Sequence, residues 1–278
     1  MVTFPNAKIN IGLDILRRRP DGFHDISTMM VPVGWCDILE IVPSDTADDT
    51  LTVTGRGVDC PPEKNLVMKA VKAARRHAGF PPVDIFLHKI IPDGAGLGGG
   101  SADAAFAIKM VNSLFDLGFD DEKMAAIASE IGSDCPFFIY NRPMMCEGTG
   151  TTLLPTNFEL PENITLVIVK PKVSVPTKAA YAGVTPCLPD TPIDTLVKSL
   201  PIEQWQGKIK NDFEASVFPE YPAISQIKEQ LLDQGAIYAS MSGSGSAVYG
   251  IFRKDDIVTE KLEPLFAGCD IFVNRQEK

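Results

Sequence analysis

The chain has 278 residues, of which 45% are hydrophobic and 22% charged, and its formal net charge is −10. This composition is typical of an ordinary globular protein, and the length suffices for two modest domains or one large one. The negative balance argues against a nucleic-acid-binding surface, which requires a basic face. It also means that an anionic ligand has to be held by a local pocket, because the overall field repels it.

The first residues and the cysteines predict a cytoplasmic protein. Residues 1–8 contain no apolar signal core, and no run of eighteen apolar residues occurs in the sequence. The cysteines form no Cys-x-x-Cys pair and have no histidine at metal-ligand spacing. We therefore expect buried free thiols in a reducing compartment. The six cysteines stand at positions 36, 60, 135, 146, 187 and 269.

The N-terminal region is predicted to consist of strands followed by one capped helix. Residues 7–16 alternate apolar and polar side chains, which predicts a half-buried strand with Lys8 and Asn10 on its polar face. Asn65 is a suitable N-cap for a helix that stops before Gly79. Further strands are expected at 27–33, 37–42, 50–54 and 83–91.

A glycine-rich loop separates the last of these strands from a second predicted helix. Apolar residues recur at helical spacing from Ala104 to Phe115, and Ser101 is expected to open that helix. Clustered glycines let successive backbone N–H groups converge on one anion, and a helix start adds further N–H groups, so the segment predicts a phosphate-binding loop. By itself the segment is also compatible with a flexible connection that has a serine cap. The loop lacks the Gly-Lys-Ser/Thr of a Walker A motif and the spacing of a dinucleotide fold. Its glycines stand at positions 94, 96, 98, 99 and 100.

A helix over 121–131 is expected to end at Gly132, and the apolar residues that follow are predicted to form a strand. Asp134 would then lie at the mouth of that strand. On the sequence alone, this aspartate is also compatible with an ordinary Asx-turn or cap.

The C-terminal region is predicted to fold as a split β-α-β-β-α-β unit. A second glycine-rich loop, 240–246, lies between its two central strands and on its own is a common hairpin connection. A boundary near residue 155 divides the chain into an expected N-terminal domain, 1–155, and a C-terminal domain, 156–278. The predicted strands are 164–169, 236–240, 247–252 and 269–274. The predicted helices are about 177–183 with the variable segment that follows to 213, counted as one crossover layer, and then 222–234 and 255–267.

Three segments together resemble the three motifs of the GHMP small-molecule kinases (galactose, homoserine, mevalonate and phosphomevalonate types). They are Pro5–Leu13, Pro92–Ala102 and Met241–Ala247, in that order. Arg-x-Asp-Gly-Phe-His over 19–24, Gly-Ser-Asp-Cys-Pro over 132–136 and Val-Ser-Val-Pro-Thr over 173–177 resemble the branch that acts on a cytidine-diphosphate substrate. The likeness extends over essentially the whole chain.

The resemblance implies an α+β, two-lobe GHMP kinase fold. Its N-terminal α/β lobe would carry the glycine-rich phosphate loop, and its C-terminal lobe would be the split β-α-β-β-α-β unit. The implied reaction transfers the γ-phosphoryl group of ATP, with Mg²⁺, to the tertiary 2-hydroxyl of a diphosphocytidyl-methylerythritol. This step belongs to the non-mevalonate route to isoprenoids and terpenoids. The implied partner is this small molecule, with no nucleic acid and no membrane.

The resemblance also assigns site residues, although each of them alone would be unremarkable. Lys8 and Asp134 would be catalytic, whereas a strand lysine is ordinarily just exposed. Phe23 and Tyr181 would sandwich the cytosine, His24 would hold its edge and Asn10 would bind substrate; a lone Tyr181 is more often core and a lone His24 a turn residue. The ATP-binding set would comprise Asn65, Leu66 and Lys89 beside the adenine, and Pro92, Asp93, Gly94, Ala95, Gly96, Leu97, Gly98, Gly99, Gly100, Ser101 and Ala102 in the loop.

Two positions depart from the family pattern, and the metal ligands stay unassigned. Phe23 stands where tyrosine is common, which keeps the stacking face and loses a hydroxyl. Asp103 stands where asparagine is common, which leaves open whether it lies near the metal.

Two other functions compete with this interpretation. A related kinase acting on mevalonate, phosphomevalonate or homoserine would need no aromatic platform such as Phe23 and Tyr181. A non-catalytic nucleotide- or RNA-binding module would need a basic patch interleaved with aromatic residues, and the acidic chain shows none.

Overall fold

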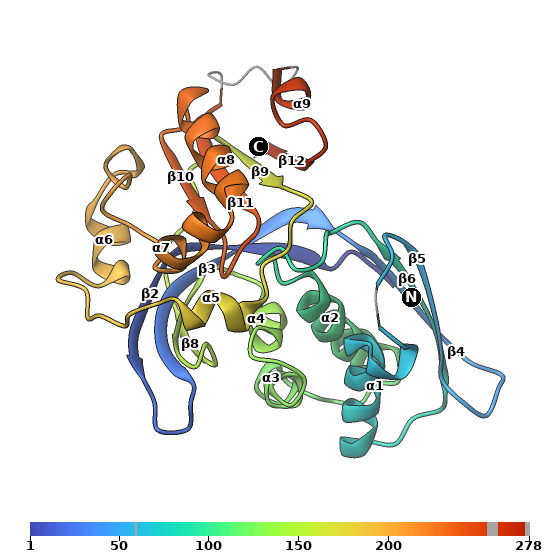
Figure 1. The fold of residues 1–278 in the computed structure, drawn as a ribbon. Coiled ribbons are helices and arrows are strands. Elements are labelled where there is room, and N and C mark those ends of the chain that lie inside the picture. Colours follow the sequence, from blue (N-terminus) through green and yellow to red (C-terminus); the bar gives the residue numbers. More distant parts are fainter. Residues whose placement is uncertain (59, 255–260, 276–278) are drawn as a thin grey trace. The chain divides into compact units, whose positions relative to one another are not determined.

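The computed structural model describes residues 1–58, 60–254 and 261–275 (Figure 1). Its contacts group the chain into two compact units that are interleaved in sequence. The first unit comprises Met1–Lys8, Gly34–Asp93 and Gly98–Arg142, and the second comprises Ile9–Val33, Gly94–Leu97 and Pro143–Lys278. These units are not contiguous halves, so they differ from the ranges 1–155 and 156–278, and that division stays a prediction.

A four-stranded sheet and a layer of helices form the first unit. The sheet has the order β1 (Val2–Thr3), β4 (Ile38–Pro43), β6 (Val83–Lys89) and β5 (Thr50–Gly55), with β5 parallel to β6. The helices α1 (Leu66–His77) and α2 (Gly99–Leu114) pack against each other (Figure 1). The predicted cap is confirmed, because the Asn65 side chain accepts a hydrogen bond from Val67 N at 2.9 Å. The short helix η1 (Pro62–Lys64) precedes that cap, and α3 (Asp121–Ser129) follows α2.

The segment after Gly132 folds as a helix, α4 (Cys135–Tyr140), and the predicted strand is wrong. Pro136 lies in the first turn, where its missing N–H costs no helical hydrogen bond and its fixed φ suits the helix. Asn141 ends the helix in the left-handed region, at a φ of 49°. All residues from 135 to 139 are buried, so the segment shows no periodicity by which a helix could be told from a strand.

The second unit contains the predicted split β-α-β-β-α-β arrangement. Its antiparallel sheet has the order β10 (Tyr238–Met241), β11 (Val248–Arg253), β9 (Ile164–Lys170) and β12 (Asp270–Arg275). Helix α8 (Pro222–Asp233) packs on β10 and β11. Of the predicted helix 255–267, residues 255–260 lie outside the described part, and the remainder contains α9 (Leu262–Leu265). Between β9 and α8 lie α5 (Thr177–Ala182), α6 (Ile193–Ser199), η2 (Ile202–Gln204) and α7 (Phe213–Glu220).

A third sheet is formed by β2 (Asn6–Arg18), β3 (His24–Cys36), β7 (Met144–Gly148) and β8 (Thr152–Pro155), in that order. The predicted strand at 7–16 is confirmed, but its half-burial is wrong, because Lys8 is only 3% exposed and Asn10 only 2%. Their polar groups are paired inside the protein: Asn10 Nδ2 donates to Thr28 Oγ1 at 3.1 Å, and Lys8 lies beside a carboxylate described below. Both faces of β2 are therefore buried over residues 7–13.

The cysteines that the structure describes are free thiols, as predicted, but only Cys135 and Cys146 are fully buried, and Cys187 is exposed. In the same described ranges, no helix has the length and apolar character that crossing a membrane requires.

Candidate active site

Helix α2 begins at Gly99, two residues before the predicted start at Ser101. Gly98 is its N-cap, at a φ of 72°, and the helical hydrogen bonds begin with Ala102 N donating to Gly98 O at 2.9 Å. A helix leaves its first N–H groups without acceptors inside the helix, and here they belong to glycines and Ser101. The start of α2 therefore offers backbone donors and a positive dipole end to an anion.

The first half of the glycine-rich loop, 94–97, is held by the second glycine-rich loop within the second unit. Ser242 Oγ donates to Gly96 O at 2.9 Å, and Ala247 N donates to Ala95 O at 3.1 Å. A Cβ on Gly96, which has a φ of 72°, would lie 2.0 Å from Ser242 O. Only glycine fits there, so loop 240–246 supports the first loop in addition to joining β10 and β11.

Within the first unit, the structure brings Lys8 and Asp134 together. Lys8 Nζ lies 3.4 Å from Asp134 Oδ2, and the side chains are 4% and 32% exposed, respectively. Asp134 immediately precedes α4, yet its side chain makes no capping hydrogen bond, which removes the cap alternative. A Cβ on Gly98 would lie 3.2 Å from Lys8 Cγ, so the lysine stem runs along the start of α2.

The thiol of Cys135, the residue that follows Asp134, is buried. Burial raises its pKa to about 11, against a smaller opposing effect of its hydrogen bond with Ser101. The thiol is therefore neutral near pH 7.

Asn65, Leu66 and Lys89, which were predicted to lie beside the adenine, differ in what they contact. Leu66 lies near the start of α2, since a Cβ on Gly100 would be 3.5 Å from Leu66 Cδ1. Asn65 is 8% exposed and caps α1. Lys89 is buried and donates to Asp37 and, at 2.7 Å, to Asp103 Oδ2. Sequence reasoning missed Asp37, although an aspartate directly before an apolar strand was a usable signal.

In the second unit, His24 and Tyr181 form a stacked ring pair. Their centroids are 4.9 Å apart with an interplanar angle of 17°, and Phe213 meets Tyr181 edge-on at 4.7 Å. Phe23, the other ring assigned to the cytosine, is 65% exposed. Asn10 is fixed by Thr28 and by its backbone N–H, which donates to Ser242 Oγ at 3.2 Å.

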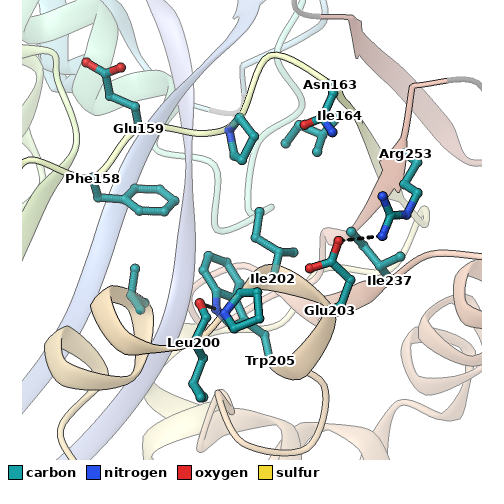
Figure 2. Close-up of a pocket in the computed structure, with 13 residues that line it drawn as sticks. Phe158, Glu159, Asn163, Ile164, Leu200, Ile202, Glu203, Trp205, Ile237 and Arg253 are labelled. Carbon is teal, nitrogen blue, oxygen red and sulfur yellow. Dashed lines mark hydrogen bonds and ion pairs between the residues drawn. The ribbon is translucent and has the colours of Figure 1, made fainter.

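Two pockets in the second unit involve none of the predicted site residues. One, with a volume of about 290 Å³, lies among Phe158, Trp205 and Ile237, with the Arg253–Glu203 ion pair at 2.8 Å beside it (Figure 2). The other, of about 750 Å³, is lined by Asp14, Asp25 and Glu147 among others. Neither pocket collects the groups that phosphoryl transfer needs.

Comparison with known proteins identifies the family. The family described as "GHMP kinases N terminal domain" matches residues 65–142, and "GHMP kinases C terminal" matches residues 193–266. A protein of Parabacteroides distasonis called 4-diphosphocytidyl-2-C-methyl-D-erythritol kinase is 48% identical over 97% of both chains. The chain belongs to the GHMP kinase family.

Other GHMP kinases agree with this membership. The 4-diphosphocytidyl-2-C-methyl-D-erythritol kinase of Bacteroides fragilis is 45% identical, over 94% of this chain and 95% of that one. A crystal structure of 4-(cytidine 5'-diphospho)-2C-methyl-D-erythritol kinase superposes with a TM-score of 0.83 at 30% identity, covering 99% and 98% of the two chains. Homoserine kinase from Cytophaga hutchinsonii shares the fold, with a TM-score of 0.71 at 20% identity over 97% and 94%. The predicted α+β, two-lobe fold is thus confirmed.

Proposed function

We propose that this kinase transfers the γ-phosphoryl group of ATP to the 2-hydroxyl of 4-diphosphocytidyl-2-C-methyl-D-erythritol, giving the 2-phosphate. The observation that carries this substrate assignment is the 48% identity, over 97% of both chains, to the Parabacteroides distasonis enzyme of that name. The reaction would be a step of the non-mevalonate route to isoprenoids. It would take place in the cytoplasm, with a small molecule as the only partner.

Lys8 and Asp134 are the proposed catalytic pair. Phosphoryl transfer passes through a loose transition state, so positioning and charge stabilisation supply most of the catalysis. Asp134 reaches solvent and would accept the hydroxyl proton as the bond to phosphorus forms. Lys8 Nζ, buried 3.4 Å from Asp134 Oδ2, would orient that carboxylate and offset charge on the attacking oxygen.

The N–H groups at the start of α2, together with the rest of Pro92–Ala102, would bind the ATP phosphates. The nucleotide would arrive as MgATP, in which the ion neutralises phosphate charge. Among the residues that the structure describes, no group of three or more His, Cys, Asp or Glu side chains could hold a metal ion.

The cytidine base would bind at the aromatic residues of the second unit. Tyr181 offers a ring face held by Phe213, and Phe23 has an exposed ring that is free to cover a base. Because His24 stacks on Tyr181, we propose that its ring turns from that face to the edge of the base when the substrate binds.

A coupled ADP-release assay tests the proposal. The purified chain is given MgATP with 4-diphosphocytidyl-2-C-methyl-D-erythritol, mevalonate or homoserine in parallel, and the phosphorylated product is identified by ³¹P NMR. Turnover should be confined to the cytidine-diphosphate substrate, with phosphate on the 2-oxygen. Preferred turnover of mevalonate or homoserine would overturn the substrate assignment while leaving the kinase family intact.

A further inference from the structure

Three buried ionisable groups join the two segments that flank the glycine-rich loop in the first unit. Lys89 ends β6, Asp103 lies in the second turn of α2 and Asp37 precedes β4. Lys89 Nζ donates to Asp37 Oδ2 and, at 2.7 Å, to Asp103 Oδ2. Their side chains are 3%, 0% and 3% exposed for Lys89, Asp37 and Asp103, respectively. We refer to these three residues as the Lys89 cluster.

The two carboxylates of the Lys89 cluster are not equivalent. Asp37 Oδ1 accepts hydrogen bonds from Ile90 N at 2.5 Å and Ile91 N at 2.8 Å, in addition to the Lys89 bond on Oδ2. Asp103 has the Lys89 bond on Oδ2, but its buried Oδ1 has no hydrogen-bond partner among the described residues. Asp37 thus accepts three hydrogen bonds, whereas within the described ranges Asp103 accepts only the one from Lys89.

Charge counting points to the same asymmetry. With both carboxylates ionised, one ammonium would leave an uncompensated buried negative charge, which is costly in a low-dielectric interior. Burial raises the pKa of Asp103 to about 7, with Asp37 adding to the rise and Lys89 opposing it. Helices α1, α3 and α4 and strand β4 also pack on α2. Within the described ranges, the ionisable groups that act on Asp103 are Lys89 and Asp37.

We propose that Asp103 is a positioning residue that carries a proton in the folded protein near neutral pH. The Lys89 cluster then has no net charge. Its hydrogen bonds connect the C-terminal end of β6 to α2 without placing a net negative charge near the start of that helix. The part that concerns nucleotide rests on the proposed ATP site. Loss of the proton adds a negative charge that disfavours a phosphate at that helix start. ATP affinity should therefore fall as the pH rises through the range in which Asp103 ionises.

The protonation is tested without nucleotide. Carbon-13 NMR of aspartate side-chain carboxyls is followed from pH 4 to pH 9, and the Asp103 signal is assigned by its disappearance in Asp103→Asn. The signal should titrate near neutral pH, well above an ordinary aspartate. A titration complete by pH 5 would overturn the proposal. The amide reproduces the neutral acid in size and charge, so failure of Asp103→Asn to fold at pH 7 would also contradict it.

The positioning role is tested by ATP affinity at pH 6 and pH 8.5 for the wild type, Asp103→Asn and Asp45→Asn. Asp45 is an exposed aspartate of the same unit and serves as the matched control. The wild type and Asp45→Asn should lose affinity roughly three- to tenfold more than Asp103→Asn between the two pH values. The titration of ATP itself is common to all three proteins. Parallel pH dependences would overturn the positioning role. Absence of ATP binding at every pH would instead overturn the proposed function, and the NMR titration would still decide the protonation.

Discussion

The buried ammonium of Lys8 lies 3.4 Å from the partly exposed carboxylate of Asp134, and the two side chains are 4% and 32% exposed, respectively. The lysine is thus held by the interior of the protein, while the aspartate is accessible to a substrate. This asymmetry suits a pair in which one member supplies fixed charge and the other exchanges a proton.

Replacement of Asp134 by asparagine should lower kcat by about 10²–10⁴-fold, because the amide cannot accept the hydroxyl proton. The KM for ATP should change little, since the start of α2 is untouched. Steady-state kinetics with both substrates measures the two effects. Asp121→Asn, in the first turn of α3, is a matched control that should leave both constants unchanged. Turnover of Asp134→Asn close to the wild-type value would exclude the proposed base.

Replacement by alanine should lower the stability of the protein at Gly96 and leave it unchanged or raise it at Gly100. At Gly96 the positive φ and the 2.0 Å approach to Ser242 O predict a loss of at least about 1–3 kcal/mol in the free energy of unfolding. At Gly100 a Cβ meets only Leu66 Cδ1, at 3.5 Å, inside a helix, so alanine should be neutral or stabilise by up to about 1 kcal/mol. Urea unfolding of the two variants measures the difference. Equal stabilities would contradict the described support of the loop.

A valine at position 98 should impair both fold and catalysis. The new Cβ would meet Phe138 Cζ at 2.9 Å and Lys8 Cγ at 3.2 Å, at a φ of 72° that a β-branched residue avoids. Displacement of the Lys8 stem should lower kcat, and distortion of the α2 start should weaken ATP binding. Equilibrium ATP binding and kcat are measured for Gly98→Val and Gly79→Ala, whose added Cβ would meet no atom within 4 Å. Normal ATP affinity in Gly98→Val would argue against a phosphate site here.

Asp14 should make stability depend on pH. Burial, and then the charge of Asp212, raises its pKa to about 7, so the folded state binds a proton that the unfolded state has already released. Stability is therefore greatest below the unfolded pKa and falls until the pH passes about 7. Asp14→Asn removes this effect, so its urea midpoint should exceed that of the wild type by an amount that grows from pH 5 to pH 7 and then levels off. A constant gap would contradict the shift.

Tyr181→Leu should raise the KM for the cytidine-diphosphate substrate while leaving the KM for ATP unchanged, because leucine removes the ring face. Tyr181→Phe keeps that face and is the matched control. Steady-state kinetics with each substrate varied in turn distinguishes them. An unchanged substrate KM in Tyr181→Leu would place the base elsewhere.

The sequence predicted helices and strands well wherever the apolar residues recur with one clear spacing, either that of a helix or that of a strand. The cap at Asn65 and the order of the strands in the split β-α-β-β-α-β unit followed directly from local signals. The α4 segment could not be predicted in this way. Its residues 135–139 are all buried, so apolar and polar positions do not alternate with a helical or strand spacing. Helix α7 was missed for a different reason. Pro219 lies within it, and a proline inside a segment argues against a helix.

The site was less predictable than the fold, because its decisive contacts join residues far apart in the chain. Lys8 resembles an ordinary strand lysine until Asp134, distant in sequence, is placed beside it. Asp37 gave only a weak local signal, and its partner Lys89 is 52 positions away. The start of α2 was misplaced by two residues because a glycine, not Ser101, is the cap.

The interleaving of the two compact units bears on how such enzymes can be recombined. Residues 9–33 belong to the same unit as the C-terminal part of the chain, and 94–97 are also built into it. A chimera that joins the first 155 residues of one homologue to the remainder of another would thus exchange pieces of both units at once. Grafts should succeed better when the donor segment comprises 34–93 alone, since that stretch begins and ends within one unit.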